Sequence, residues 1–343
     1  MRAGQPVTIR DVAQRAGVSS ATVSLVLNNV ADSRVSAATA ERVRAAASEL
    51  AYAPNLVARG LRRRRTNTIA VLSDEIATTP FASRMIGAIQ DVAMRNGLLV
   101  FMVNTAGDPE TERSAVVAFN QQQVDGFVYA CLYHRVVDLP PGLGSNVVVL
   151  DGRTRRPRFP AVVPDDRGGA RAAVTELLAH GHRRIGFVND YSATVAADLR
   201  LKGYRDALRE HGVRFDKRAV RNAEPGLEPS AEAAVRLHED AGVTALFCFN
   251  DRVAIGAYHG LRRHGLAVPR DVSVVGFDDQ EFVADYADPP LTTVALPHYA
   301  MGQWAAEELI ERINGGTDQP RVCEMPCELV RRGSVGPPRA DGT

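Results

Sequence analysis

Three polar residues of the chain directly follow runs of apolar residues. Asp278 follows VSVVGF, Asn250 follows ALFCF and Asp151 follows NVVVL. A carboxylate or amide that ends a buried strand can form hydrogen bonds with the hydroxyl groups of a bound molecule. Arg200 lies between two leucines, a setting that does not fit a surface arginine, and its planar guanidinium can donate several hydrogen bonds. These residues predict a site for a polar small molecule, although a role for Asp151 in a hinge between lobes is an equal alternative.

The elements that must position these residues are strands that alternate with helices. From Thr68 onward, short apolar segments alternate with segments of helical length, as in parallel sheets that carry helices on both faces. The strands form two sets, near 68–152 and 183–279, which indicates two lobes. Ligands of open α/β sheets bind beyond the carboxyl ends of the strands, so we expect the site between the lobes, with Asp251 and Asp279 as helix caps. The predicted strands are TIAVLSD, LLVFMVN, DGFVYAC, NVVVLDG, RRIGFVND, TALFCFND and VSVVGFDD.

Charge is distributed unevenly along the chain. The whole chain has a formal charge of +1, but residues 1–65 hold 11 Arg, no Lys and 4 acidic residues, which gives +7. The remaining residues carry −6. Because neutralisation of phosphates supplies most of the affinity for nucleic acid that does not depend on base sequence, the basic segment indicates a polyanionic partner.

The basic segment has the pattern of three short helices. The first begins at Thr8, with Asp11 three residues later as in a capping box, and ends at Gly17. Ser19 can cap the second helix, and the third runs from Ser36 to about Leu50. Two helices joined by a tight turn with glycine are typical of the DNA-binding helix-turn-helix, although a plain three-helix bundle is the alternative. The second helix would present Ser20, Ala21, Ser24, Leu25 and Asn28 outward.

The N-terminal part resembles the headpiece and hinge of the LacI family of transcriptional regulators. The similar sequences are VTIRDVAQRAGVSSATVSLVLNN and VSAATAERVRAAASELAYAPNLVARGLRRRRTNTIAVL. The rest resembles the sensor domain of that family, and through it periplasmic sugar-binding proteins, in VDGFV, HGHRRIGFVN, RLKGY, FCFND, VPRDVSVVGFDD and PPLTTV. The resemblance implies an all-α helix-turn-helix headpiece plus an α/β, periplasmic-binding-protein-like (type I) two-lobed sensor domain.

The resemblance also implies which residues contact DNA. Ser20 and Ala21 would face base edges, where their small side chains give modest direct readout. Leu25 departs from the family, in which many members have an arginine at this position that reads guanine. The other residues implied to contact DNA, most of them near phosphates, are Thr8, Ser19, Thr22, Ser24, Asn28, Arg34, Ser36, Thr39, Tyr52 and Asn55.

A short hinge is expected after the headpiece. Pro54 ends the third helix, and Asn55 can cap the segment Leu56–Leu61, which is too short to be a stable helix alone. The resemblance implies that the hinge becomes helical on DNA, that Leu61 inserts into the minor groove and kinks it, and that Ala58 lies beside it. The following run of four arginines is either a solvated linker or a further set of phosphate contacts.

The resemblance places seven residues at the ligand. Arg200, Asp278 and Asn250 are supported by their sequence settings as well, whereas an aromatic residue such as Phe81 is more often part of a core. Arg, Asp and Asn suit a sugar, which we expect as the effector, and Phe81 would also suit a nucleobase. The seven residues are Phe81, Asp151, Arg200, Leu227, Asn250, Asp278 and His298.

Composition and motifs limit the other function classes. The apolar content of 45% is ordinary for globular proteins, no run approaches the length of a membrane span, and the first residues do not form a signal peptide. We therefore expect a cytoplasmic protein with four free thiols, with Cys323 and Cys327 in a strand context rather than at a metal. His180 and His182 are expected to serve a turn. Nucleotide-binding, hydrolase and zinc motifs are absent, so we expect no cofactor, no metal and no enzyme activity.

The predicted organisation has four parts. Residues 1–53 form the headpiece, 54–65 the hinge and arginine linker, 66–332 the effector-binding and dimerisation domain, and 333–343 a flexible tail rich in glycine and proline. A helix-turn-helix that reads palindromic half-sites implies a homodimer on an operator of double-stranded DNA. The alternative is a solute-binding protein without a DNA role, which would need an export signal.

Overall fold

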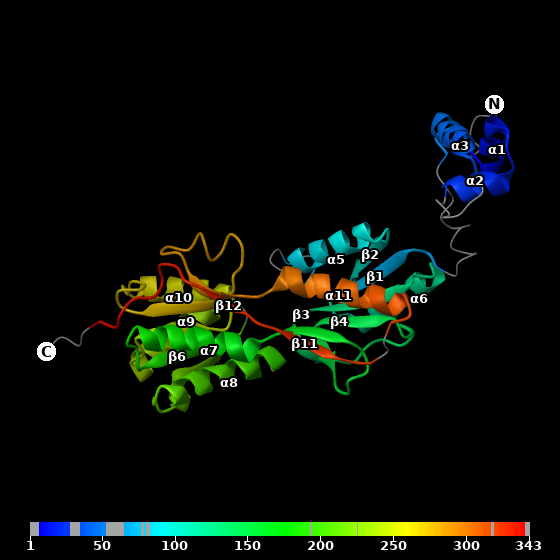
Figure 1. The fold of residues 1–343 in the computed structure, drawn as a ribbon. Helices are drawn as coiled ribbons and strands as arrows, with labels where there is room; N and C mark the ends of the chain where they lie inside the picture. Colours follow the sequence, from blue (N-terminus) through cyan, green and yellow to red (C-terminus); the bar gives the residue numbers. More distant parts are fainter. Residues whose placement is uncertain are drawn as a thin grey trace. The chain divides into compact units, whose positions relative to one another are not determined.

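The computed structural model describes residues 7–27, 35–52, 65–76, 79, 83–192, 194–224, 226–316 and 319–339. By its internal contacts the chain divides into a small unit, residues 1–66, and a large unit, residues 67–343 (Figure 1).

The small unit holds three helices, α1 (Ile9–Ala16), α2 (Ser20–Leu27) and α3 (Ala37–Glu49). Gly17 ends α1 in the left-handed conformation, with φ of 66°, which glycine adopts without strain. Apolar residues at helical spacing bury one face of each helix in a shared core, and Val12, Val23 and Val43 are fully buried in it. The predicted helix-turn-helix fold is confirmed.

The large unit contains two six-stranded sheets, and we call each sheet with its helices a lobe. In the first lobe all neighbouring strands are parallel, in the order β11-β5-β4-β3-β1-β2. Side chains alternate along the strands, so that Val71 and Val128 pack under α5 and α11, whereas Leu72 and Phe127 pack toward α6. The bounds are β1 (Thr68–Ser73), α5 (Ser83–Arg95), β2 (Leu99–Asn104), α6 (Pro109–Gln121), β3 (Gly126–Val137), β4 (Val147–Thr154), β5 (Ala161–Pro164), α11 (His298–Ile313) and β11 (Val322–Met325).

The second lobe has the strand order β12-β10-β9-β8-β6-β7, in which only the short edge strand β12 runs antiparallel to its neighbour. One continuous apolar core joins this sheet to its four helices. The bounds are α7 (Asp166–Ala179), β6 (Ile185–Asp190), α8 (Val195–Glu210), η3 (Lys217–Ala219), β7 (Val220–Ala223), α9 (Leu227–Ala241), β8 (Ala245–Cys248), α10 (Asp251–Arg263), β9 (Ser273–Asp278), β10 (Thr292–Ala295) and β12 (Glu328–Val330).

The chain passes between the lobes three times: from β5 to α7, from β10 to α11, and from β11 to β12 (Figure 1). The two predicted lobes are therefore present, but the first lobe also contains α11 and β11 from late in the sequence. The strands that sequence reasoning missed, β5, β7, β10 and β12, are only three or four residues long, whereas β11 contains Cys323, for which a strand context was expected. Such short segments carry little periodicity.

The segment 333–339 differs from the predicted flexible tail. Ser334 is fully buried, and its hydroxyl accepts a hydrogen bond from Thr292 N (2.8 Å) and donates one to Val274 O (2.6 Å). Val274 N donates to Ser334 O (3.0 Å). These bonds attach the segment to β9 and β10, so the expectation of flexibility was wrong for 333–339; residues 340–343 lie outside the described part.

The four cysteines form no disulfide, and His182 takes part in hydrogen bonds within the fold. Cys131, Cys248, Cys323 and Cys327 are all free thiols. The ring of His182 lies 2.8 Å from Thr244 Oγ1 and 2.8 Å from Gly336 O, so it joins a turn to the C-terminal segment. Within the described residues, no group of His, Cys, Asp and Glu could hold a metal ion, and no helix is long and apolar enough to cross a membrane.

Candidate DNA-binding surface and effector site

The outward face of α2 is the candidate DNA-reading surface. Val23 and Val26 point into the headpiece core, whereas Ala21 and Leu25 are exposed and Ser20 and Ser24 are half-buried. The predicted outward residues that the structure describes therefore lie away from the core. This surface is uncharged, so its contacts with base edges would be apolar contacts and single hydrogen bonds.

Hydroxyl groups gather at the N-termini of the headpiece helices. Ser19 Oγ accepts a hydrogen bond from Thr22 N (3.1 Å) and lies 2.9 Å from Thr22 Oγ1. Ser36 repeats this arrangement with Thr39, at 3.3 and 3.0 Å. Helix N-termini favour anions because their backbone N–H groups lack intrahelical partners, so these ends suit phosphates.

Two further predicted contacts are partly used inside the headpiece. The Asp11 carboxylate accepts hydrogen bonds from both N (2.8 Å) and Oγ1 (2.7 Å) of Thr8, and the bond from the Thr8 hydroxyl lowers the pKa of Asp11. Tyr52 is half-buried against the headpiece core. The remaining predicted contacts lie outside the described residues: Asn28, Arg34, Asn55, Ala58 and Leu61.

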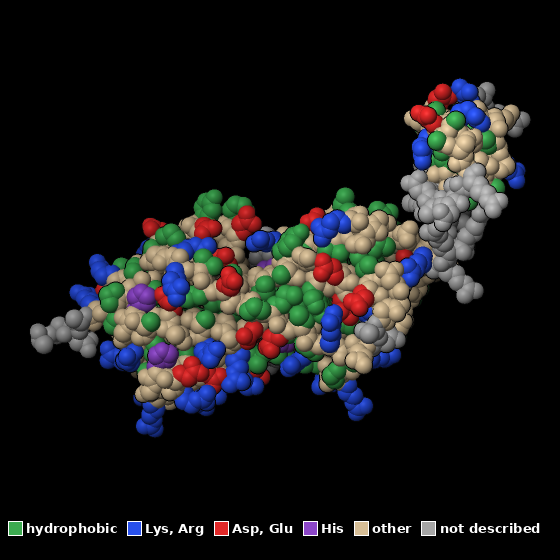
Figure 2. All heavy atoms as spheres, viewed as in Figure 1, with side chains coloured by type: hydrophobic (Ala, Val, Ile, Leu, Met, Phe, Trp, Pro, Cys, Tyr) green, Lys and Arg blue, Asp and Glu red, His purple; other side chains and the backbone are tan. Residues whose placement is uncertain are grey.

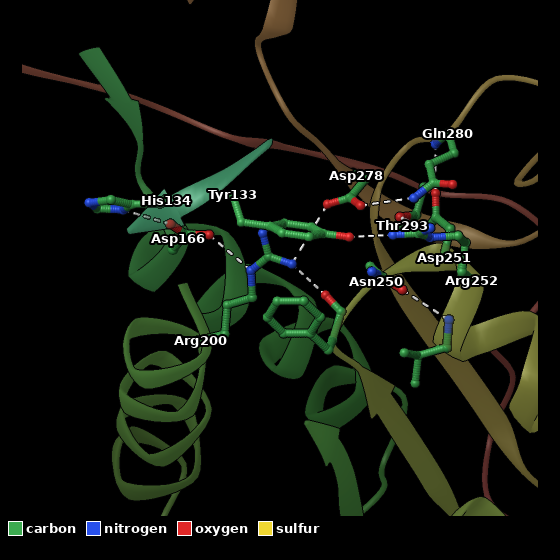
Figure 3. Close-up of polar contacts among 12 residues, drawn as sticks. Tyr133, His134, Asp166, Arg200, Asn250, Asp251, Arg252, Asp278, Gln280 and Thr293 are labelled. Carbon is green, nitrogen blue, oxygen red and sulfur yellow. Dashed lines mark hydrogen bonds and ion pairs between the residues drawn. The ribbon is translucent and has the colours of Figure 1, made fainter. Parts of the chain in front are cut away.

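Five of the residues predicted to bind a ligand are buried in the large unit. Asp151 lies in β4, Asn250 follows β8, Asp278 ends β9, Arg200 lies in α8 and His298 begins α11, and each is only 2–5% exposed. Figure 3 shows Arg200, Asn250 and Asp278 close together at the end of the second sheet. The strand ends of the second lobe thus bring polar groups to one place, as expected for this sheet type.

Arg200 is the centre of this cluster. Its Nε donates to Asp166 Oδ1 (2.9 Å), and its Nη1 donates to Phe249 O (2.5 Å) and lies 3.6 Å from Asp278 Oδ1 (Figure 3). The guanidinium carbon lies 3.7 Å from the centre of the Phe277 ring and 4.4 Å from that of Phe249. These contacts fix the plane of the guanidinium between two carboxylates and two aromatic rings.

Four buried polar atoms of Asp, Asn and His side chains in the large unit have no hydrogen-bond partner among the described residues. They are Asp151 Oδ1, Asp278 Oδ1, Asn189 Oδ1 and His134 Nε2. Burial raises the pKa of Asp278 to about 6, against the opposing effect of Arg200. Burial, and then the neighbouring Asp166 carboxylate, raise the pKa of Asp151 well above its usual value. Because a buried acceptor without a partner costs free energy, these oxygens favour a ligand that donates hydrogen bonds.

Asn250 has a structural contact beside its predicted role, and the two aspartates that follow β8 and β9 do not cap helices as predicted. Asn250 caps α10, with its Oδ1 accepting from Val253 N (2.9 Å), so only its amide nitrogen could donate to a ligand. Asp251, expected as a cap, instead accepts from Gln280 N (2.7 Å) and Thr293 Oγ1 (2.5 Å). Asp279 caps no helix and pairs with Arg332 at 2.8 Å. Asp251 thus holds the loop that follows β9 inside the second lobe. The spacing of residues in the sequence did not reveal this role.

The remaining predicted ligand residues have different settings. His298 and Asp278 line a cavity of about 30 Å³ together with Arg84, Asp279, Glu281, Ala295 and Leu296. Burial lowers the pKa of His298 to about 4, so the ring is neutral at pH 7. Leu227 begins α9 and is 46% exposed, unlike the other five, and Phe81 lies outside the described residues.

Sequence reasoning missed part of the site. Asn189 lies near the end of β6 after the run IGFV, so the rule that selected Asn250 and Asp278 could also have found it. Asp166, the first residue of α7, gave no comparable signal. Tyr133 and His134 lie in an irregular part of β3, which no periodicity reveals.

Comparison with known proteins agrees with this architecture. Residues 8–55 match the family of bacterial regulatory proteins called the lacI family, and residues 174–335 match a periplasmic binding protein-like domain. The HTH-type transcriptional repressor PurR of Vibrio atlanticus (strain LGP32) is 33% identical over 338 residues, covering 96% of this chain and 98% of the relative.

Two solved structures extend the similarity to the fold. The lac repressor dimer bound to operator and the anti-inducer ONPF has a TM-score of 0.80 and 29% identity, covering 97% of this chain and 100% of that chain. The complex of the transcriptional regulator CelR with cellobiose has a TM-score of 0.68 and 30% identity, covering 96% and 99%.

The headpiece and the two-lobed unit define a class of protein: a DNA-binding transcriptional regulator with a sensor domain, rather than an enzyme. The chain belongs to the LacI family of bacterial regulatory proteins.

Proposed function

We propose that this protein is a dimeric repressor whose affinity for a palindromic operator is set by a small polar effector, most simply a sugar, bound at Arg200. The observation that carries this proposal is the buried cluster in which Arg200 is fixed between Asp166 and Asp278, beside acceptor oxygens without partners. Differential affinity of the effector for the two states of the protein would shift DNA binding by linkage.

A sugar fits this cluster because each hydroxyl both donates and accepts hydrogen bonds. Hydroxyls can donate to the free oxygens of Asp151, Asp278 and Asn189 and accept from the guanidinium of Arg200. The similar regulator CelR binds the sugar cellobiose. A nucleobase remains the second candidate because the cluster also has aromatic walls, Phe249 and Phe277, against which a flat ring could stack.

DNA binding is assigned to α2 and the hinge. Ser20 and Ala21 would read base edges, Leu25 would make apolar contact, and the capped helix ends would hold phosphates. The hinge segment, with Leu61 as the wedge in the minor groove and Ala58 beside it, would add readout of DNA shape.

Dimerisation is supported by the exposed apolar surface of the edge strand β2. Leu99, Phe101 and Met102 are all exposed on this strand, and Met94 of α5 and Val117 of α6 are exposed on the helices that flank the sheet. An apolar edge strand invites association, and a second copy of the chain would cover it. We refer to these five residues as the β2 patch.

The proposal is tested by selecting operators from a random duplex library and then measuring operator affinity with D-ribose, cellobiose and hypoxanthine. We expect a preferred palindromic duplex and a change of about 5- to 150-fold in its affinity with one of these compounds. Absence of any preferred duplex would contradict the DNA role, and a preferred duplex whose affinity no compound alters would contradict the effector classes named here.

A further inference from the structure

The end of α8 and the loop after it form a basic segment in an otherwise acidic unit. Residues 202–218 hold six basic and three acidic side chains, which gives +3, whereas residues 66–343 together carry −6. Three of the basic side chains are exposed and lie close together in the sequence: Arg205, Arg209 and Arg214. Because like charges in so short a segment repel one another, their concentration here indicates an anionic partner.

These three arginines line one depression in the surface of the second lobe. It has a volume of about 640 Å³, within the range of about 300–1,000 Å³ of sites for small organic ligands. Among the described residues, every charged residue of the lining is basic, and the rest of the lining consists of Gly212, Val213 and Phe215. The depression thus presents three guanidinium groups beside an apolar wall.

The shape of the depression is fixed by the reversal of the chain after α8. Gly212 has φ of 68°, which lets the chain turn back, and Val213 N donates a hydrogen bond to Leu208 O (2.8 Å). The rings of Phe215 and Tyr204 meet edge to face, with their centres 6.2 Å apart. The walls are therefore in place before a ligand binds, which lowers the entropic cost of binding.

Two of the three arginines form no ion pair with a described residue. Arg214 also forms no hydrogen bond there, and the guanidinium carbon of Arg205 lies 4.5 Å from the centre of the Phe215 ring. Arg209 differs, because it donates to Asp206 Oδ1 (2.7 Å), and the other oxygen of this carboxylate accepts from an arginine of α7. The depression thus contains two guanidinium groups whose charge no carboxylate neutralises by direct contact.

The position of these arginines at the end of a helix does not explain them. Backbone carbonyl groups at a helix C-terminus carry a partial negative charge, which favours basic residues in the last turn. Arg209 lies in that turn, but Arg205 precedes it and Arg214 lies beyond the helix. The carbonyl groups of Ala207, Leu208 and Arg209 already accept hydrogen bonds from the backbone of the loop that follows. The guanidinium groups are therefore available to a ligand.

Two guanidinium groups without ion pairs favour a ligand that carries two phosphate groups. Each guanidinium is planar and can donate two parallel hydrogen bonds to one phosphate. The volume of the depression also leaves room for an organic group against Val213 and Phe215. A nucleoside diphosphate combines both features.

We propose that the depression at the end of α8 binds a small organic diphosphate, such as a nucleoside diphosphate, and that Arg205 and Arg214 hold its phosphates. This site is separate from the cluster around Arg200. Arg209 lies nine residues after Arg200 on the same helix, which corresponds to a rise of about 14 Å. The second lobe therefore has a small-molecule site in addition to the effector site proposed above.

Two double variants, each lacking two positive charges of the second lobe, test this assignment. Arg205→Gln/Arg214→Gln changes the depression, whereas Arg236→Gln/Arg263→Gln changes two exposed arginines that pair with glutamates elsewhere on the lobe. Because both change the net charge equally, a difference between them reports the depression itself. Arg214→Gln alone breaks no hydrogen bond or ion pair with a described residue, so an effect of this variant on binding does not reflect unfolding.

The first measurement is calorimetric titration of the full-length protein with ADP, pyrophosphate and adenosine. ADP and pyrophosphate should bind and adenosine should not, because the phosphates supply the charged acceptors. ADP should bind Arg205→Gln/Arg214→Gln more weakly by about tenfold or more and Arg214→Gln by about threefold or more, but Arg236→Gln/Arg263→Gln as tightly as the parent. Absence of ADP binding, adenosine binding as tight as that of ADP, or equal weakening in the two double variants would overturn the proposal.

The second measurement distinguishes a small phosphate ligand from the phosphates of DNA. The two double variants should bind a duplex of random sequence with equal affinity, because the depression is assigned to a small molecule. A loss of about tenfold or more in Arg205→Gln/Arg214→Gln alone would instead assign these arginines to the DNA backbone and overturn the proposal.

Discussion

Arg200 shows how one residue can organise a buried polar site. It is only 2% exposed, yet its charge is balanced by Asp166 and Asp278, and its faces lie against two phenylalanine rings. Breaking a buried ion pair costs more than breaking a surface pair, because the remaining carboxylates lose their partner without regaining water. The residue that would bind the effector therefore also stabilises the second lobe.

We expect Arg200→Met to lower the free energy of unfolding by about 3–5 kcal/mol, as two buried carboxylates lose their cation. Urea unfolding measures this change. Arg171→Met is the matched control, because Arg171 pairs with Glu210 at 3.4 Å on the exposed surface and should contribute less than about 1 kcal/mol. Equal urea midpoints for Arg200→Met and Arg171→Met would contradict the stabilising role of the buried ion pairs of Arg200.

The pKa of Asp278 predicts a dependence of stability on pH. Burial raises this pKa to about 6 in the folded protein from 3.8, so the folded state binds more protons than the unfolded state between pH 4 and 6. Stability should therefore decrease as pH rises through this range, by roughly 3 kcal/mol from Asp278 alone.

Thermal unfolding between pH 4 and 7 should show a flatter profile for Asp278→Asn than for the parent chain. Asp216→Asn serves as the control, since the hydrogen bonds from Arg218 lower the pKa of the half-buried Asp216 and the removal of its carboxyl should not flatten the profile. If the stability of the parent chain and that of Asp278→Asn change equally between pH 4 and 6, the pKa of Asp278 is not raised.

At the scale of elements, the headpiece depends on its turn. Gly17 joins α1 to α2 with φ of 66°, and no heavy atom lies near the position of an added Cβ, so only backbone strain opposes a larger residue. We expect Gly17→Ala to destabilise the headpiece by about 1 kcal/mol and to speed amide exchange in α1 and α2 about fivefold. Gly87→Ala, in helix α5 and equally unobstructed, should leave its helix as stable or more stable. Similar exchange in both parent and Gly17→Ala headpieces would show that the turn tolerates a side chain.

The hinge gives a second prediction at this scale. We expect Leu61→Ala to lower operator affinity about tenfold or more and to abolish DNA bending, because the wedge no longer separates the base steps. Gel mobility of circularly permuted operator fragments measures the bend. Leu56→Ala, in the same segment but without a predicted DNA contact, should keep it; loss of bending in both would point to the hinge helix rather than to the wedge.

The elements also show what the sequence could and could not predict. The long apolar runs of β1, β3, β4, β6, β8 and β9 were predicted because each buries most of its side chains. Arg200 and Asp278, which were predicted to bind one ligand, are buried neighbours, and their role in ligand binding stays a prediction. The bulge of β3, the attachment of Ser334 and the role of Asp251 could not be predicted, because each depends on partners far away in sequence.

At the scale of the whole molecule, the β2 patch predicts the oligomeric state. We expect Phe101→Glu to convert a dimer to a monomer in sedimentation, since an unpaired charge would be buried at the interface, and to weaken binding to a palindromic operator. Val322→Glu is the control, because Val322 is exposed on β11, the opposite edge of the same sheet. A dimer that persists in Phe101→Glu but not in Val322→Glu would place the interface at the other edge.

The three passages of the chain between the lobes (Figure 1) have a consequence for how such proteins can diversify. Figure 2 shows acidic, basic and apolar side chains mixed over the visible face of the large unit. Neither lobe corresponds to one uninterrupted stretch of the gene, because α11 and β11 are encoded after almost the whole second lobe. A single crossover between two related genes therefore cannot exchange one intact lobe for another. New effector preferences are expected to arise by point substitution in the existing scaffold, whereas the headpiece, encoded in one block, can be exchanged by one recombination event.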